Sequence, residues 1–326
     1  MQQPAFLRET EYSLQMQQTV QPVLQSAREE RTLTTADGKQ LFVVCYRARQ
    51  PRGSVVILHG FGETAEKYHE LCYYFLQCGY NVLVYDQRGH GRSTRLAAQG
   101  VVHNPEFEKY VEDLAFVLEA EQESLPAPRY LFSHSMGGAV AALYLERGGS
   151  FFKKAVLSSP MIYMHHKRVP RKAGELLCHI GCRLRPAADR FFAVSAAPTP
   201  ENESFERSAA SSQARFEYYR TVKSQSPLLY ASKASNGWML EAMRCPRRIL
   251  KKGAPERVQT PLRVYAAEWE TLVDRRPQQK FAKRVQTGRF FLVKGCKHEI
   301  YFATDEVLHP FLCELLAYFD VTPPNG

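Results

Sequence analysis

An apolar run that stops at a serine and then restarts constrains this 326-residue chain more than any other feature. Residues 130–132 read as the end of a strand, Ser135 follows at a sharp turn, and residues 139–145 read as a helix. A serine at such a junction holds its hydroxyl above the sheet edge, and small residues must flank it because the backbones pass closely. Gly137 supplies the small residue after the serine, while Ser133 stands where the G-x-S-x-G pattern has its first glycine. The stretch predicts a nucleophile elbow.

Apolar strands alternate with helical patterns on both sides of this turn. Runs such as Val55–Leu58 and Asn81–Tyr85 are almost wholly apolar, which is typical of parallel strands covered on both faces. An Asp-Gly turn predicts that the fold opens with an antiparallel hairpin over residues 32–47. Apolar residues at helical spacing predict helices at 67–77, 110–122, 278–285 and 306–319. The sequence therefore predicts an α/β fold with a mostly parallel central sheet flanked by helices.

The alternation breaks after Pro160 and resumes at residue 262. Residues 161–258 hold 18 Lys and Arg against 8 Asp and Glu, so this segment accounts for the whole net charge of +10. We interpret residues 1–160 and 259–326 as one core, and residues 161–258 as a basic helical cap inserted after the sixth strand. Such a cap is placed to cover the carboxyl ends of the strands, where these sheets bind ligands. A localised cationic surface favours phosphate groups or anionic lipid headgroups.

Acyl transfer needs a base and an acid as well as the serine, and on this kind of fold the chain order is Ser, acid, His. His298 follows the last predicted strand, where the base is expected. Three carboxylates follow the strand predicted at 262–267. We predict Asp274 as the acid, with Glu268 and Glu270 as rivals, because the longer loop before Asp274 lets its side chain return to the site.

Two backbone N–H groups are expected to bind the oxyanion that forms during acyl transfer. One belongs to Met136, directly after the nucleophile, and the other to Phe61, after the His59-Gly60 turn that ends a strand. The Gly-rich stretch at 86–93 lacks the Lys-Ser/Thr ending of a phosphate-binding loop. We interpret it as scaffolding beneath the site.

These motifs together carry a resemblance. They are HGFGE at 59–63, DQRGHGRS at 86–93, SHSMGG at 133–138, and the late Asp274 and His298. The chain resembles the monoacylglycerol lipase branch of the α/β-hydrolases, and most closely the bacterial lysophospholipases of the L-two type, from about residue 35 to 320. The resemblance implies an α/β-hydrolase fold and a serine hydrolase that releases a fatty acid from a monoacyl glycerolipid. It also implies that Ser135, Asp274 and His298 form the triad, with Phe61 and Met136 as oxyanion donors.

We therefore predict a carboxylic ester hydrolase that needs no metal or cofactor. Its expected substrate is a lysophospholipid, cleaved to a free fatty acid and the glycerol head-group product, with monoacylglycerol lipase or general carboxylesterase activity as the alternative. A proline iminopeptidase-like amide hydrolase would want an acidic group in the cap to capture the substrate amine, and the cap is basic. A non-catalytic module that binds nucleic acid through cap arginines and aromatics is disfavoured by the ordered triad.

The composition also predicts where the chain works. Residues 1–31 contain no apolar run suited to a signal peptide, and no segment reaches the roughly 18 apolar residues of a membrane span. Eight scattered cysteines are typical of free thiols in a reducing compartment. We expect a cytoplasmic protein, without a nucleic-acid partner, whose cap meets an anionic membrane surface peripherally on the cytoplasmic face.

Overall fold

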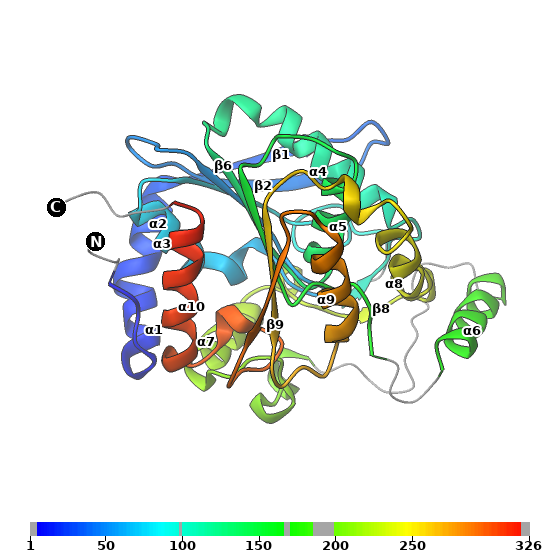
Figure 1. The fold of residues 1–326 in the computed structure, drawn as a ribbon. Helices are drawn as coiled ribbons and strands as arrows, with labels where there is room; N and C mark the ends of the chain where they lie inside the picture. The colour runs from blue at the N-terminus through cyan, green and yellow to red at the C-terminus, as the bar shows by residue number, and fades with distance from the viewer. Residues whose placement is uncertain (1–4, 98–99, 166–169, 185–198, 321–326) are drawn as a thin grey trace.

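A sheet of eight strands runs through the centre of the computed structural model, which describes residues 5–97, 100–165, 170–184 and 199–320 (Figure 1). Its strand order is β1-β2-β4-β3-β6-β7-β9-β10. β2 pairs antiparallel with β1 and β4, and the other neighbours pair in parallel, as predicted. The strands of this sheet are β1 (Arg28–Thr34), β2 (Gln40–Tyr46), β3 (Ser54–Leu58), β4 (Asn81–Tyr85), β6 (Arg129–His134), β7 (Lys154–Ser158), β9 (Leu262–Ala267) and β10 (Arg289–Val293).

Successive residues of each central strand pack on opposite faces of the sheet, which creates two hydrophobic cores. In β3, Val56 and Leu58 belong to one core, whereas Val55 and Ile57 belong to the other. All four side chains are fully buried. Burial on both faces explains why these strands read as continuous apolar runs rather than as alternating ones.

Helices cover both faces of the sheet (Figure 1). α4, α5 and α9 pack on one core, and α3 and α10 pack on the other. These helices are α3 (His69–Gln77), α4 (Glu108–Ala120), α5 (Met136–Leu145), α9 (Arg275–Arg284) and α10 (Asp305–Tyr318). The predicted helices agree with them to within a few residues at most ends. Short 3₁₀ turns link the elements at η3 (Ala65–Tyr68), η4 (Gln122–Ser124), η5 (Pro200–Asn202), η6 (Phe205–Arg207), η7 (Pro227–Leu229), η8 (Pro255–Arg257) and η9 (Ile300–Phe302).

The N-terminal segment, in which we predicted no element before the hairpin, is helical. It contains η1 (Glu9–Glu11), α1 (Tyr12–Gln15), a π-helical stretch η2 (Met16–Val20) and α2 (Gln21–Ala27). Its buried side chains join the same core as α3 and α10, and α1, α2, α3 and α10 gather on one side of the sheet (Figure 1). Tyr12, Met16, Val20 and Leu24 are buried at every fourth position, but polar residues, mostly glutamine, and Pro22 lie between them and mask the helical pattern.

The described part of the insertion between β7 and β9 contains helices that do not pack as one block. α7 (Gln213–Ser224) joins the core that contains α3 and α10, whereas α8 (Asn236–Ile249) joins the core that contains α5. A short strand, β8 (Ala231–Ala234), pairs in parallel with β5 (Gly100–Val102). α6 (Arg171–Leu184) packs on α8 and stands apart from the sheet (Figure 1). The basic residues Lys167, Arg168, Arg185 and Arg190 lie outside the described residues.

Arg215 in α7 shows that a basic residue of the insertion can be internal. Its side chain is fully buried, and its Nε and NH2 groups each donate to the Glu70 carboxylate of α3 at 2.9 Å. Its NH1 group donates to Asp305 at 2.9 Å, at the start of α10. The guanidinium also lies 4.9 Å from the ring centre of Tyr12 in α1. One side chain therefore joins the N-terminal segment, α3, α7 and α10.

Replacing Arg215 with Met should destabilise the protein by about 3–5 kcal/mol, because the Glu70 and Asp305 charges would lose their buried partner. Arg220→Met on the same helix is the matched control, since Arg220 and Glu217 form an exposed pair and should contribute about 1 kcal/mol or less. Urea unfolding of both variants measures the difference. Equal losses from the two changes would contradict a structural role for Arg215.

Candidate active site

The chain follows the predicted strand–turn–helix path at Ser135, between β6 and α5. Ser135 has φ 50° and ψ −113°, a conformation that non-glycine residues rarely adopt and that is typical of a nucleophile elbow. Its N–H donates to Ser158 O at 3.0 Å, and its carbonyl accepts from Met161 N–H at 2.8 Å. A Cβ at Gly137 would lie 2.5 Å from Leu58 O, so only glycine fits beside this turn. Hydrogen bonds to both the N–H and the carbonyl of Ser135 therefore stabilise its strained conformation.

Ser133, the departure from the G-x-S-x-G pattern, fits inside the sheet. Its side chain is fully buried in β6, and its hydroxyl donates to Val156 O of β7 at 3.3 Å. A hydroxyl with a backbone acceptor is tolerated in a core, whereas an unpaired one is costly. The sheet therefore accommodates the Ser133 side chain next to the elbow.

His298 lies beside the elbow and is held by Glu270. Its Nδ1 is 2.6 Å from Glu270 Oε2, and both side chains are almost completely buried. The other carboxylate oxygen of Glu270 accepts from the N–H of Leu272 at 2.7 Å. Burial opposes ionisation of Glu270, but the hydrogen bond and charge of His298 lower its pKa overall. Ser159 Oγ donates to His298 O at 2.8 Å and links the histidine loop to the end of β7, beside Ser135.

The structure does not bring Asp274, our predicted acid, to the histidine. Asp274 precedes α9, where its Oδ1 accepts from Arg276 N–H at 2.9 Å as an N-cap and its Oδ2 pairs with the Arg276 guanidinium at 3.0 Å. Glu268 instead accepts from Gly295 N–H at 3.0 Å. Of the three carboxylates after β9, Asp274 caps the next helix and Glu270 contacts His298.

Glu270→Gln should lower kcat by about a thousandfold or more, because an amide neither stabilises the imidazolium nor fixes the Nδ1–H tautomer. Asp274→Asn should leave kcat within about twofold, since asparagine also caps helices well. Steady-state hydrolysis of a p-nitrophenyl ester by the two variants checks the order. Loss of activity from Asp274→Asn together with tolerance of Glu270→Gln would restore the sequence-based assignment.

The turn after β3 directs the Phe61 N–H, the first predicted oxyanion donor. The preceding carbonyl, Gly60 O, lies 2.7 Å from His59 Nδ1 and accepts from Glu63 N–H at 3.3 Å. His59 Nε2 accepts from Gln87 N–H at 2.8 Å, so Nδ1 carries the proton and donates. The C=O and N–H of a trans peptide point in opposite directions, so anchoring Gly60 O aims the Phe61 N–H the other way. Met136, the second predicted donor, is the first residue of α5 and has no intrahelical acceptor for its N–H.

Glu63, to which sequence reasoning gave no role, organises the same turn from below. Its buried carboxylate accepts from Gly60 N–H at 2.6 Å, Lys67 Nζ at 2.8 Å, and the hydroxyls of Tyr68 and Tyr301 at 2.7 Å each. Burial opposes its ionisation, but the charge of Lys67 and the hydrogen bonds from Lys67 and Tyr301 hold its pKa well below the usual range. Glu63 is the last residue of the HGFGE motif, but the sequence did not reveal which residues its carboxylate contacts.

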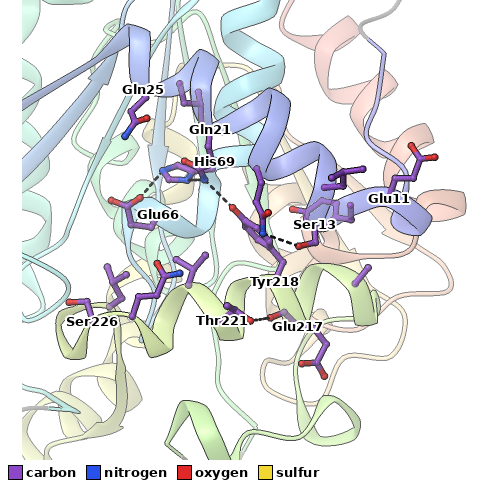
Figure 2. Close-up of a pocket in the computed structure, with 18 of the residues that line it drawn as sticks. Glu11, Ser13, Gln21, Gln25, Glu66, His69, Glu217, Tyr218, Thr221 and Ser226 are labelled. Atoms are coloured by element: carbon purple, nitrogen blue, oxygen red, sulfur yellow. Dashed lines mark hydrogen bonds and ion pairs between the residues drawn. The ribbon is translucent and has the colours of Figure 1, made fainter.

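A large pocket lies elsewhere, between the N-terminal helices and α7 (Figure 2). Its volume is about 1230 Å³, and its lining includes none of the residues predicted for catalysis. His69 on its wall is already engaged, since Nδ1 lies 2.8 Å from Gln21 Nε2 and Nε2 lies 2.8 Å from Glu66. We therefore assign it no catalytic part. Among the residues that the structure describes, no cluster of three His, Cys, Asp or Glu could hold a metal ion.

A family model described as serine aminopeptidase, S33 matches residues 49–305. The chain belongs to this family. The matched range begins before β3 and ends at the start of α10, so it contains the elbow, Glu270 and His298.

Individual relatives agree with the predicted resemblance to the monoacylglycerol lipase and lysophospholipase group. Lysophospholipase L2 of Escherichia coli is 29% identical over 314 residues, covering 90% of this chain and 88% of that protein. Monoacylglycerol lipase of Mycolicibacterium smegmatis is 32% identical over 145 residues, covering 44% and 50%. The crystal structure of a soluble variant of Saccharomyces cerevisiae monoglyceride lipase superposes with a TM-score of 0.70 at 18% identity, covering 92% and 96%. The predicted α/β-hydrolase fold is confirmed.

Proposed function

We propose that this chain hydrolyses the acyl ester of a monoacyl glycerolipid, with a lysophospholipid as its preferred substrate, and releases a free fatty acid and the glycerol head-group product. That it is a carboxylic ester hydrolase follows from its lysophospholipase and monoacylglycerol lipase relatives. The observation that carries the proposal is the buried pair of His298 and Glu270 beside a strained serine at a nucleophile elbow.

In the proposed reaction, Ser135 Oγ attacks the acyl carbonyl. Because the Glu270 carboxylate can only accept, it holds the Nδ1–H tautomer of His298 and leaves Nε2 as the base that takes the serine proton. The Phe61 and Met136 N–H groups stabilise the oxyanion. His298 then returns the proton to the glycerol oxygen as the C–O bond breaks, and a water molecule repeats the sequence to release the fatty acid.

Ser135→Ala should abolish ester hydrolysis while leaving the fold intact, since removal of the nucleophile costs several orders of magnitude in rate. A fluorophosphonate probe should label the native protein and leave the Ser135→Ala protein unlabelled, with unchanged circular dichroism. Ser133→Ala is the matched control and should still be labelled. Labelling that survives in Ser135→Ala, or that maps to Ser133, would remove the nucleophile from Ser135.

The choice of a lysophospholipid rests on how much of the chain each relative matches. The similarity to lysophospholipase L2 extends over 90% of the chain, whereas the similarity to the mycobacterial monoacylglycerol lipase covers 44%. The insertion lies over the substrate side of such folds, so a match that runs through it bears on head-group preference. The expected result is faster hydrolysis of a lysophospholipid than of a monoacylglycerol with the same acyl chain. Cleavage of an amino-acid p-nitroanilide instead would favour the aminopeptidase activity named in the family description.

We further propose that the enzyme works peripherally at an anionic membrane surface on the cytoplasmic side, through α6. Leu176, Leu177 and Ile180 are exposed on this helix by 59%, 52% and 42%, beside the exposed cations of Lys172 and Arg183. This mixture suits a helix that rests apolar side chains on lipid while its cations meet phosphate. Within the described part of the chain, no helix is both long and apolar enough to cross a bilayer. Within the residues that the structure describes, no two cysteines form a disulfide, as a reducing compartment favours.

Other cations of the insertion are less available than their number suggested. Arg244 and Arg248 both pair with Glu241, and Arg247 pairs with Glu175. Lys223 pairs with Glu203, and Arg215 is fully buried. The proposal therefore rests on α6 rather than on the total charge of residues 161–258.

Changing Leu176, Leu177 and Ile180 together to Gln should release the protein from anionic vesicles and leave hydrolysis of a soluble ester unchanged. Native binding should weaken as salt is raised, since each basic side chain near an anionic leaflet contributes about 1 kcal/mol and is screened within about 10 Å. Leu292→Gln, an exposed leucine on β10, is the matched control for vesicle co-sedimentation. Binding that is insensitive to both salt and the α6 changes would count against this role for α6.

A further inference from the structure

The turn at residues 59–63, which carries the Phe61 N–H proposed to bind the oxyanion and is called the oxyanion turn here, contacts the insertion as well as the Glu63 carboxylate. Phe61 packs on Trp238 of α8, with ring centres 4.3 Å apart and planes inclined at 50°. A Cβ at Gly62, where φ is +73°, would lie 2.3 Å from Ala231 O of β8, so the turn and this strand are in direct backbone contact. The β8–α8 segment therefore covers the turn that presents the Phe61 N–H.

We infer that Trp238 is a positioning residue for the oxyanion turn, acting through the side chain of Phe61. The inference rests on the proposed function, because it concerns the Phe61 N–H that is proposed to bind the oxyanion. Gly60 and Gly62 flank Phe61 and have no side chains to restrict their torsions. Hydrogen bonds to Gly60 O anchor the peptide plane on one side of the donor. The Trp238 indole holds the Phe61 ring on the other side of the donor. With both the Gly60 carbonyl and the Phe61 ring held, the direction of the Phe61 N–H is restricted.

Trp238 can hold Phe61 in place because hydrogen bonds anchor the first turn of α8, which carries the indole. The indole is 3% exposed. Ser235 caps the helix by accepting from Trp238 N–H at 3.1 Å, and its hydroxyl lies 2.8 Å from His103 Nδ1. Ser235 N–H in turn donates to Val102 O of β5 at 3.0 Å. The start of α8 is thus tied to the segment of β5 and His103 at two points.

The opposite side of α8 offers a comparison within the same helix. Leu240 and Met243 are also buried there, but they pack with Cys178 of α6 in a small separate cluster. Truncating one of them removes packing from α8 without touching Phe61. Trp238 and Leu240 therefore separate a general effect on α8 from a specific effect on the turn.

The inference is tested with Trp238→Leu, Trp238→Phe and the control Leu240→Ala, on p-nitrophenyl butyrate, with rates expressed per site titrated by a fluorophosphonate. Trp238→Leu should lower kcat by about tenfold, less than the hundredfold or more for complete loss of an oxyanion donor. KM should stay within about twofold, and inhibition by a boronic acid, whose adduct mimics the tetrahedral intermediate, should weaken in proportion to kcat. Trp238→Phe, which keeps a ring against Phe61, should recover most of the rate, and Leu240→Ala should leave it unchanged.

Phe61→Leu reports on the same contact from the other side, since it removes the ring and keeps the backbone donor. The double variant Phe61→Leu with Trp238→Leu should be no slower than either single variant, because the two changes break one contact. If Trp238→Leu does not fold, Phe61→Leu alone should show the tenfold loss of kcat at constant KM. A raised KM with normal kcat, an unchanged boronic acid affinity or additive losses would overturn the inference. Failure of Ser135 labelling would instead overturn the proposed function, whatever Trp238 does.

Discussion

The hydrogen bonds accepted by the buried carboxylate of Glu63 hold the two loops of the candidate site together. It binds the Gly60 N–H of the oxyanion turn and the hydroxyl of Tyr301, three residues after His298. Lys67 extends this link, since its Nζ contacts both Glu63 at 2.8 Å and Glu299 at 2.6 Å. The oxyanion turn and the histidine loop come from segments more than 230 residues apart, so a common anion between them fixes their relative position. Desolvation makes an unpaired charge here costly, which keeps the network closed.

Two helices of the insertion pack on the core through contacts of different chemistry. On one side, Arg215 of α7 makes a buried ionic cluster with Glu70 and Asp305. On the other side, α8 packs through apolar residues, and Trp238 among them reaches the oxyanion turn. α6 is attached to the rest of the described chain mainly through α8. A segment that reads as one basic cap therefore has two anchored parts and one exposed helix, and its formal charge overstates the charge available to a ligand.

The sequence allowed the sheet, most helices and the turn at Ser135 to be predicted, because apolar runs and glycine turns are local signals. The position of His298 followed from its place after the last predicted strand. The sequence was insufficient for the acid: Asp274 directly precedes α9, and we placed the start of that helix at 278, so its capping role was not visible. Glu270 owes its contact with His298 to the path of the loop after β9, which no periodicity encodes. Glu63 and Arg215 were unpredictable for a related reason, since the residues that balance their charges lie far away in the chain. The helical N-terminal segment was missed because its apolar residues are spaced by glutamines and its stability comes from packing on α3 and α7.

His134 completes the electrostatic argument for the site. Its ring lies close to both Glu63 and His298, with its centre 4.8 Å from that of His298 and its Nε2 3.9 Å from Glu63. Burial lowers the pKa of His134 to about 3, so the ring is neutral at neutral pH. The imidazolium proposed to form at His298 would therefore have a neutral ring and the Glu270 carboxylate as neighbours. A neutral ring therefore separates the charged network around Glu63 from the pair of His298 and Glu270.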